Sequence, residues 1–215
     1  MSLASRVIPG VGRVHAQVPV FASAWAAANA DALQSNGKLW VALGDSMSQG
    51  IGAGSISGGW VGQLQAELAA AGSPPRLVNL SVTGARGRDV LDDQLPRLRE
   101  IGIEPDLVTV LIGANDMLFR SRRIAAVGSF ARLIDELPAG RTVIGTLPRR
   151  NREALAINAL IEAAEAAGRV RVAELRGGRL RDIRGTLAED HFHPNERGYA
   201  RIAAAFAAGS RPSDS

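Results

Sequence analysis

The sequence contains no cysteine, so it forms no disulfide, offers no thiolate ligand to a metal and has no cysteine nucleophile. Any covalent catalyst in this chain is therefore a serine, threonine, lysine, histidine or carboxylate side chain. Lysine is nearly absent too, since Lys38 is the only one. Aromatic residues make up 4% of the chain, which leaves little material for stacking nucleic-acid bases. No apolar stretch reaches the roughly 18 residues that a membrane span needs.

The net charge is only +4, and the basic character of the chain comes from arginines spread along its whole length. Scattered arginines that face solvent explain this pattern better than a nucleic-acid footprint does. We therefore expect no nucleic-acid partner. The same composition gives no sign of oligomer formation, and a monomer is the default expectation.

With 46% hydrophobic and 21% charged residues, the 215-residue chain has the composition of a globular protein. A single domain of this length buries about 70% of the surface that its unfolded chain exposes. We expect a helical N-terminal extension over residues 1–37, one main domain over residues 38–208 and a flexible tail over residues 209–215. The sequence shows no internal repeat and no low-complexity tract.

An apolar run at residues 18–28 is followed by Ala30, and Ala28-Asn29-Ala30 has the small-x-small form of a signal cleavage site. The region before this run is interrupted by three residues that disfavour a continuous helix, Pro9, Gly10 and Gly12. The alternative is a helix over 18–30 that packs on the domain, with Trp25 as its anchor. We expect a cytoplasmic protein; export with cleavage near Ala30 is the alternative.

Apolar, β-branched runs alternate with helical patterns along the rest of the chain. This alternation predicts a five-stranded parallel sheet covered by helices on both faces, with all carboxyl ends of the strands at one edge. Pro96 is expected to bend or break the helix predicted over 88–101, and the last helix is expected to start near Pro194. The predicted strands are 38–43, 76–81, 106–112, 141–147 and 169–175.

Ser46 follows the first strand in the sequence Gly44-Asp45-Ser46, which is where α/β proteins place reactive groups. A serine becomes a nucleophile when a base removes its proton and a third group orients that base. Asp190 and His193 are three residues apart on a tight turn, so the carboxylate can accept a hydrogen bond from the imidazole. The alternatives are an ordinary turn at Ser46, a polar surface loop at 189–194, and a metal pair formed by His191 and His193.

Acyl transfer also needs donors for the oxyanion of the tetrahedral intermediate. Asn115 follows the central strand and offers a side-chain amide, and Gly84 follows the second strand and offers an unobstructed backbone N–H. Turn chemistry alone also explains these residues. Asp116 is predicted to be a helix cap or loop brace, and Asp45 is predicted to be structural because it adjoins Ser46.

Four short motifs occur in a fixed order: Gly-Asp-Ser at 44–46, Asn-Leu-Ser-Val-Thr-Gly at 79–84, Gly-Ala-Asn-Asp at 113–116 and Asp-x-x-His-Pro at 190–194. Together they resemble the SGNH (GDSL-type) hydrolase family over roughly residues 38–206. Pro105-Asp106 and Asn158 also resemble the family. The sequence departs from the ordinary α/β-hydrolase elbow, G-x-S-x-G, because residue 48 is a serine.

This resemblance implies a three-layer αβα sandwich with a flavodoxin-like sheet, and hydrolysis of esters or thioesters through a serine acyl-enzyme. It implies Ser46 as nucleophile, His193 as base and Asp190 as the residue that orients it. The N–H groups of Ser46 and Gly84 and the side chain of Asn115 would form the oxyanion hole. The mechanism needs no metal and no cofactor.

The main hypothesis is thus a serine hydrolase for small carboxylic esters, with short acyl chains as the expected substrates. A thioesterase, a carbohydrate acetylesterase and a non-catalytic domain that binds acyl or sugar ligands are the alternatives. An acyl pocket could draw on six apolar side chains, although core packing explains most of them equally well; these are Phe21, Trp25, Met47, Trp60, Met117 and Phe119.

Overall fold

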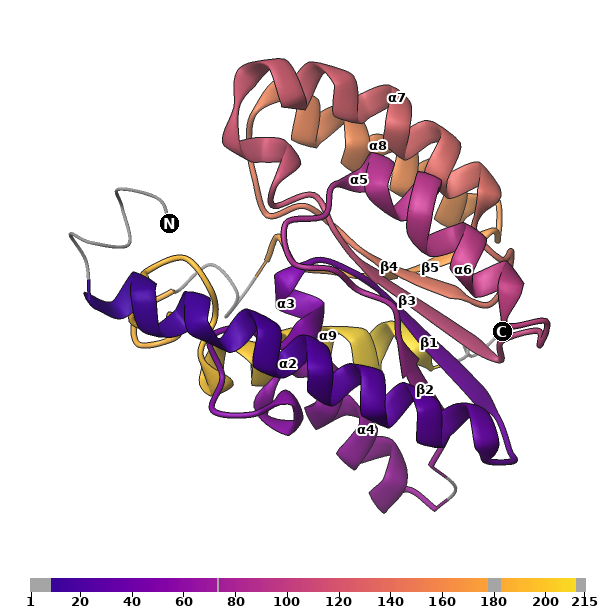
Figure 1. Ribbon diagram of the computed structural model, residues 1–215. Coiled ribbons are helices and arrows are strands. Elements are labelled where there is room, and N and C mark those ends of the chain that lie inside the picture. Colours follow the sequence, from indigo (N-terminus) through magenta and orange to yellow (C-terminus); the bar gives the residue numbers. More distant parts are fainter. Residues whose placement is uncertain (1–8, 73, 178–182, 212–215) are drawn as a thin grey trace.

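A computed structural model describes residues 9–72, 74–177 and 183–211 of the protein. Its centre is one five-stranded sheet in the order β2-β1-β3-β4-β5, in which every neighbouring pair is parallel (Figure 1). This confirms the predicted fold. The sequence predicted all five strands. The first is shifted by one residue and the other four are shorter than predicted: β1 Leu39–Gly44, β2 Arg76–Asn79, β3 Leu107–Leu111, β4 Thr142–Gly145 and β5 Val170–Ala173.

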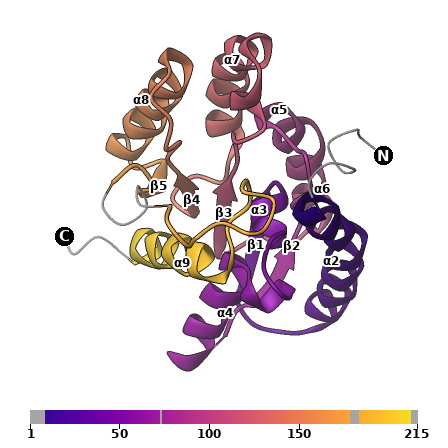
Figure 2. The same cartoon turned by 90° about the vertical axis from the view of Figure 1, so that its left-hand side faces the viewer.

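Helices cover both faces of the sheet and form the outer layers of the sandwich (Figure 2). On one face lie α4 (Trp60–Ala70) and α9 (Glu196–Ser210). On the other face lie α7 (Arg120–Glu136), α8 (Arg152–Ala166) and a composite helix of α5 (Gly87–Asp89), η2 (Val90–Gln94) and α6 (Leu95–Glu100). Helix α2 (Pro9–Gln34) runs along the β2 edge. Three short turns of helix complete the fold: α3 (Ser46–Gln49), η1 (Ile56–Gly58) and η3 (Asp116–Leu118).

Two apolar cores lie above and below the sheet because neighbouring strand residues point to opposite faces. Along β1, Val41 and Leu43 face α5 to α8, whereas Trp40 and Ala42 face α4 and α9. All six residues of β1 are buried, as expected for a central parallel strand.

The helix predicted over 88–101 is interrupted at the expected place. Pro96 lacks an N–H, and the turn before it, Val90–Gln94, is a π-helix in which the N–H of Leu95 donates to the carbonyl of Val90. The wider turn aims the Gln94 side chain at the end of β1, where its amide bonds to both the N–H and the carbonyl of Gly44.

The N-terminal helix α2 is longer than the sequence indicated, and the expectation that three early residues interrupt it was wrong. Pro9 opens the helix, a position where its missing N–H costs nothing. Gly10 lies against the backbone of Glu189, where a Cβ would overlap the carbonyl oxygen. Trp25 is buried, as predicted. No helix among the described residues is both long and apolar enough to cross a membrane.

At the other end of the chain, α9 continues through Ser210, so the first two residues of the predicted tail, 209 and 210, are helical. Residues 212–215 lie outside the described part, as do residues 178–182 of the loop after β5. The N-cap of α9 is Asn195, whose side chain accepts from the N–H of Gly198. Pro194 therefore precedes the cap rather than forming the first helical turn.

Candidate active site

Ser46 lies at the carboxyl end of β1 because the chain turns sharply at Gly44. Gly44 has a φ of 148°, and a Cβ there would overlap the carbonyl of Leu111. Asp45 then caps α3, its Oδ1 accepting from the Met47 N–H at 3.0 Å. Ser46 consequently occupies the first helical position, with its hydroxyl at the carboxyl edge of the sheet.

The structure joins the side chains of Ser46, His193 and Asp190 in one hydrogen-bonded chain. His193 Nε2 lies 2.9 Å from Ser46 Oγ, and His193 Nδ1 lies 2.5 Å from Asp190 Oδ2. The other Asp190 oxygen, Oδ1, accepts from the backbone N–H groups of Phe192 and His193, at 3.0 Å each. The carboxylate therefore fixes both the ring and the turn that carries it.

The surroundings of Asp190 favour its charged form. Burial raises the pKa of this carboxyl, but hydrogen bonds from the His193 ring and from two backbone N–H groups together outweigh burial and hold the pKa below its usual value. A charged Asp190 can stabilise an imidazolium at His193. His191, with a φ of 55°, turns away from Asp190 toward the adjoining cavity.

The three proposed oxyanion donors also gather at this edge. The turn before Gly84 is tied to β1, since the Val82 N–H donates to the carbonyl of Gly44 at 3.2 Å. Gly84 has a φ of 84° and open space where a Cβ would lie. Among the described residues, its N–H has no acceptor. Asn115 Nδ2 donates to the carbonyl of Ala85 at 2.9 Å and lies 3.4 Å from Asp45 Oδ2.

The sequence analysis did not identify the polar side chains that join the loop after β1 to the loop after β2. The Asn79 side chain donates to the carbonyl of Ser48 at 2.8 Å and accepts from Ser81 N–H at 3.0 Å. The Gln49 side chain donates to the carbonyl of Ser81 at 3.1 Å and accepts from the Thr83 hydroxyl. The one available signal was an amide residue inside or beside an otherwise apolar element.

Two further carboxyl groups under the site are structural, as predicted. Asp116 braces a loop, because its Oδ2 accepts from the Gly87 N–H at 3.0 Å. Burial, reinforced by the nearby charge of Asp116 and only partly offset by the Met47 N–H, raises the pKa of Asp45 to about 7. The Asp45 carboxyl is thus about half protonated at pH 7, whereas the Asp190 carboxyl is charged.

A cavity of about 820 Å³ opens beside Ser46 and His193 and is lined by their sequence neighbours, including Met47 and Phe192. Met117 also lines it, so two of the six proposed pocket residues belong to its wall. Phe21, Trp25 and Trp60 are buried in the core instead, and Phe119 is 55% exposed.

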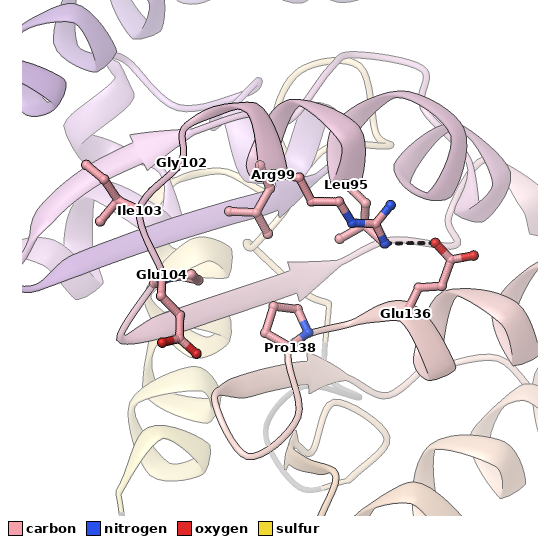
Figure 3. Close-up of a pocket in the computed structure, with 9 residues that line it drawn as sticks. Leu95, Arg99, Gly102, Ile103, Glu104, Glu136 and Pro138 are labelled. Atoms are coloured by element: carbon pink, nitrogen blue, oxygen red, sulfur yellow. Dashed lines mark hydrogen bonds and ion pairs between the residues drawn. The ribbon is translucent and has the colours of Figure 1, made fainter.

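A smaller cavity of about 300 Å³ lies at the opposite, amino-terminal edge of the sheet (Figure 3). The Arg99–Glu136 ion pair, with an N–O distance of 2.9 Å, spans it. Because its lining residues, including Ile103 and Pro138, precede β3 and β4, this cavity is remote from Ser46.

The predicted alternative of a metal pair finds no third ligand in the part of the chain that the structure describes. No group of three or more histidine, aspartate or glutamate side chains is placed there to hold a metal ion. His191 and His193 instead face different surroundings, one toward the cavity and the other between Asp190 and Ser46.

Comparison with solved structures supports the fold over most of the chain. TesA is 22% identical, with a TM-score of 0.63, over 81% of this chain and 99% of its own. A family 3 carbohydrate esterase of Clostridium thermocellum is 21% identical, with a TM-score of 0.65, over 80% of this chain and 94% of its own. LAE5, an alpha/beta hydrolase enzyme from the metagenome of Lake Arreo, is 25% identical, with a TM-score of 0.59, over 83% and 97%.

Sequence similarity to one family of hydrolases, together with this fold, defines the protein as a carboxylic ester hydrolase. The model of the GDSL-like lipase/acylhydrolase family matches residues 42–201, and the chain belongs to that family. The resemblance inferred from the four sequence motifs is thereby confirmed. No curated protein is a significant match to the sequence. The matched region begins inside β1 and ends inside α9, so helix α2 lies outside it.

Proposed function

We propose that the protein hydrolyses carboxylic esters through an acyl-enzyme on Ser46. The observation that carries this proposal is the hydrogen-bonded chain from Asp190 through His193 to the Ser46 hydroxyl, placed at the mouth of an apolar cavity. The nucleophile is within hydrogen-bond distance of the base, and the base is within hydrogen-bond distance of the orienting acid, which is the geometry that serine acyl transfer requires.

In the first half-reaction, Ser46 Oγ attacks the ester carbonyl carbon while His193 Nε2 takes the hydroxyl proton. Asp190 stabilises the imidazolium that forms at His193. The carbonyl oxygen becomes an oxyanion and accepts hydrogen bonds from the N–H groups of Ser46 and Gly84 and from Asn115 Nδ2. The Gly84 N–H has no acceptor among the described residues, whereas Asn115 Nδ2 exchanges its longer contact, at 3.4 Å with Asp45 Oδ2, for the oxyanion.

The tetrahedral intermediate then collapses. The bond between the carbonyl carbon and the alcohol oxygen breaks, and the alcohol leaves with the proton held on His193. Water repeats the sequence: His193 takes one proton from it, the hydroxide attacks the acyl-enzyme, and Ser46 leaves with the proton from His193. One ester and one water become one acid and one alcohol.

The acyl group of the substrate has room in the cavity beside Ser46. Its walls between the strand ends are largely apolar, with Met47, Met117 and Leu147 among them. Short-chain esters satisfy the chemistry, and a volume of about 820 Å³ admits longer chains too. A kinetic series of p-nitrophenyl esters from acetate upward measures the preferred length.

The decisive experiment is labelling with a fluorophosphonate probe together with turnover of p-nitrophenyl acetate. Wild type should be labelled and active, whereas Ser46→Ala should lose both. Ser48→Ala is the matched control, because Ser48 lies on the same short helix and its hydroxyl points back to the carbonyl of Leu43 at 3.4 Å. Undiminished turnover by Ser46→Ala would overturn the mechanism, and an unlabelled wild type would indicate a binding domain.

A further inference from the structure

The charged side chains that line the large cavity are mostly positive. Four arginines line the cavity, and Asp45 is the single acidic residue among the lining residues. Burial also keeps the Asp45 carboxyl from carrying a full charge at neutral pH. The arginines are Arg149, Arg150, Arg176 and Arg201.

The arginines differ in how their charge is balanced. Arg176 makes ion pairs with Glu162 and Glu174, each with an N–O distance of 2.5 Å, so its charge is already compensated. Arg149 and Arg150 are exposed neighbours that form no ion pair or hydrogen bond with any described residue. Two adjacent guanidinium groups repel each other until an anion lies between or beside them.

The basic pair and the reacting serine follow different strands at the same edge of the sheet. Ser46 follows β1, and Arg149 and Arg150 follow β4, two strands away in the order β1-β3-β4 (Figure 2). Neighbouring strands lie about 4.8 Å apart, so about 10 Å separates the ends of β1 and β4 along the edge. The two arginines lie in the loop beyond the end of β4, Gly145. Between the serine and the arginines, the wall is apolar, with Ile112 and Leu147 contributing side chains.

The cavity has the reacting serine beside one end, apolar side chains in the middle and arginines at the other end. A complementary substrate has an ester, an apolar segment and an anionic group in the same order. We propose that the preferred ester carries an anionic group, a carboxylate or a phosphate, remote from its carbonyl carbon, and that Arg149 and Arg150 bind this group at the wall of the cavity. The inference rests on the function proposed above and adds a substrate class to it. The anion can belong to the acyl chain or to the alcohol, and the chemistry at the arginines is the same.

Two pairs of probes test the proposal and distinguish the two sources. For the acyl side, p-nitrophenyl octanoate is compared with p-nitrophenyl hydrogen octanedioate, which ends in a carboxylate. For the alcohol side, monooctanoylglycerol is compared with the same ester carrying a phosphate on the glycerol. Each pair is measured with wild type, with the double variant Arg149→Gln/Arg150→Gln, and with Arg152→Gln. Arg152 is the matched control, since it is exposed nearby on α8 but does not line the cavity.

Wild type should prefer the anionic member of at least one pair by about tenfold in kcat/KM at low salt, expressed mainly in KM. The preference should shrink as ionic strength rises, because partly exposed charges are screened. It should also disappear in the double variant and persist in Arg152→Gln. The pair that shows the preference identifies the part of the substrate that carries the anion.

Equal rates for both members of both pairs would overturn the proposal, and so would a preference that survives in the double variant. Failure of the proposed function has a different signature, namely neutral-ester hydrolysis that persists in Ser46→Ala. Loss of neutral-ester turnover in Ser46→Ala, combined with no charge preference, would leave the acyl-enzyme intact and remove only the anionic substrate class.

Discussion

The two sides of the active site are held in different ways. On the nucleophile side, the loops after β1 and β2 are joined to each other and to the π turn by buried amide side chains, from Gln49, Asn79 and Gln94. On the base side, the loop that carries Asp190 and His193 is held by the β-bridge between Leu187 and Pro194 and by the Asn195 side chain, which donates to the carbonyls of Gly185 and Leu187.

Helix α2 adds contacts both to this loop and to the loop after β1. Gly10 packs against the backbone of Glu189, and Arg13 forms an ion pair with the Glu189 side chain. The Gln17 side chain donates to the carbonyl of Ala53 at 2.9 Å and accepts from the Gly52 N–H at 2.8 Å.

Helix α2, which lies outside the region that defines the family, also holds the nucleophile side: Trp25 Nε1 donates to the carbonyl of Gln49, and Asn29 bonds to the backbone of Asn79. Both sides therefore depend partly on this added helix, and the nucleophile side has buried amide bonds of its own as well.

The strongest way to break the base side is Asp190→Asn. An asparagine keeps the shape of the side chain but not its charge, so His193 loses its preferred tautomer and the partner of its imidazolium. We expect kcat to fall by about 10³–10⁴-fold, the typical cost of this change in serine triads. Steady-state kinetics on p-nitrophenyl acetate measures the loss. A variant within tenfold of wild type would remove Asp190 from the mechanism.

Asp45→Asn probes the nucleophile side through pH. The pKa of Asp45 is raised to about 7 in the folded protein, so between about pH 4 and 7 the folded form keeps a proton that the unfolded chain releases. Stability conferred by the protonated form is therefore lost as pH rises through this window, by at most about 4 kcal/mol. Asparagine cannot ionise, so the variant should lack this loss.

Urea unfolding of wild type and Asp45→Asn at pH 4, 5.5 and 8 measures the difference. The free energy of unfolding of the variant, relative to that of wild type, should increase from the lowest pH to the highest. Carboxyl groups that do not interact with Asp45 titrate alike in both proteins and cancel in the comparison; Asp116, whose charge interacts with that of Asp45, is the exception. Identical pH slopes would contradict the raised pKa.

Gln94→Leu removes the side-chain amide that holds Gly44. The Gly44 N–H loses its partner in a buried place, while the Gly44 carbonyl keeps the Val82 N–H, so the free energy of unfolding should fall by about 1–3 kcal/mol. Gln34→Leu, at the exposed end of α2, is the control and should change stability little. Equal midpoints in urea for the two variants would show that Gly44 does not need this bond.

Gln17→Ala is the mildest change and sharpens the contrast between the sides. It loosens α2 from the loop at 52–53 without touching the reacting groups. We expect kcat to fall by about threefold with KM unchanged, because substrate binding does not involve Gln17. Gln34→Ala should match wild type in both constants. A change confined to KM would place α2 in substrate binding rather than in support of the loops around the site.

The sequence was informative wherever the signal was local. Buried β-branched runs predicted the strands, and Asp190 and His193 lie close enough in the chain to be paired by inspection. Gln94 was missed because its partner, Gly44, is 50 residues away and an amide in a helix looks like a surface residue. The prediction that Gly10 interrupts the helix was wrong. Gly10 packs so closely against the backbone of Glu189 that only a glycine fits there, and this contact offsets the low helix propensity of glycine.

The bond between Gly44 and Gln94 also makes one amide hydrogen a reporter. Gly44 is the last residue of a central strand, yet the acceptor of its N–H is a side chain on the π turn rather than a neighbouring strand. Hydrogen exchange at this amide therefore follows the detachment of that helix from the sheet, not the opening of the sheet itself. If the Gly44 amide exchanges faster than the amides of Val41 and Leu43, its exchange rate measures how often the helix that carries Gln94 detaches from the end of β1.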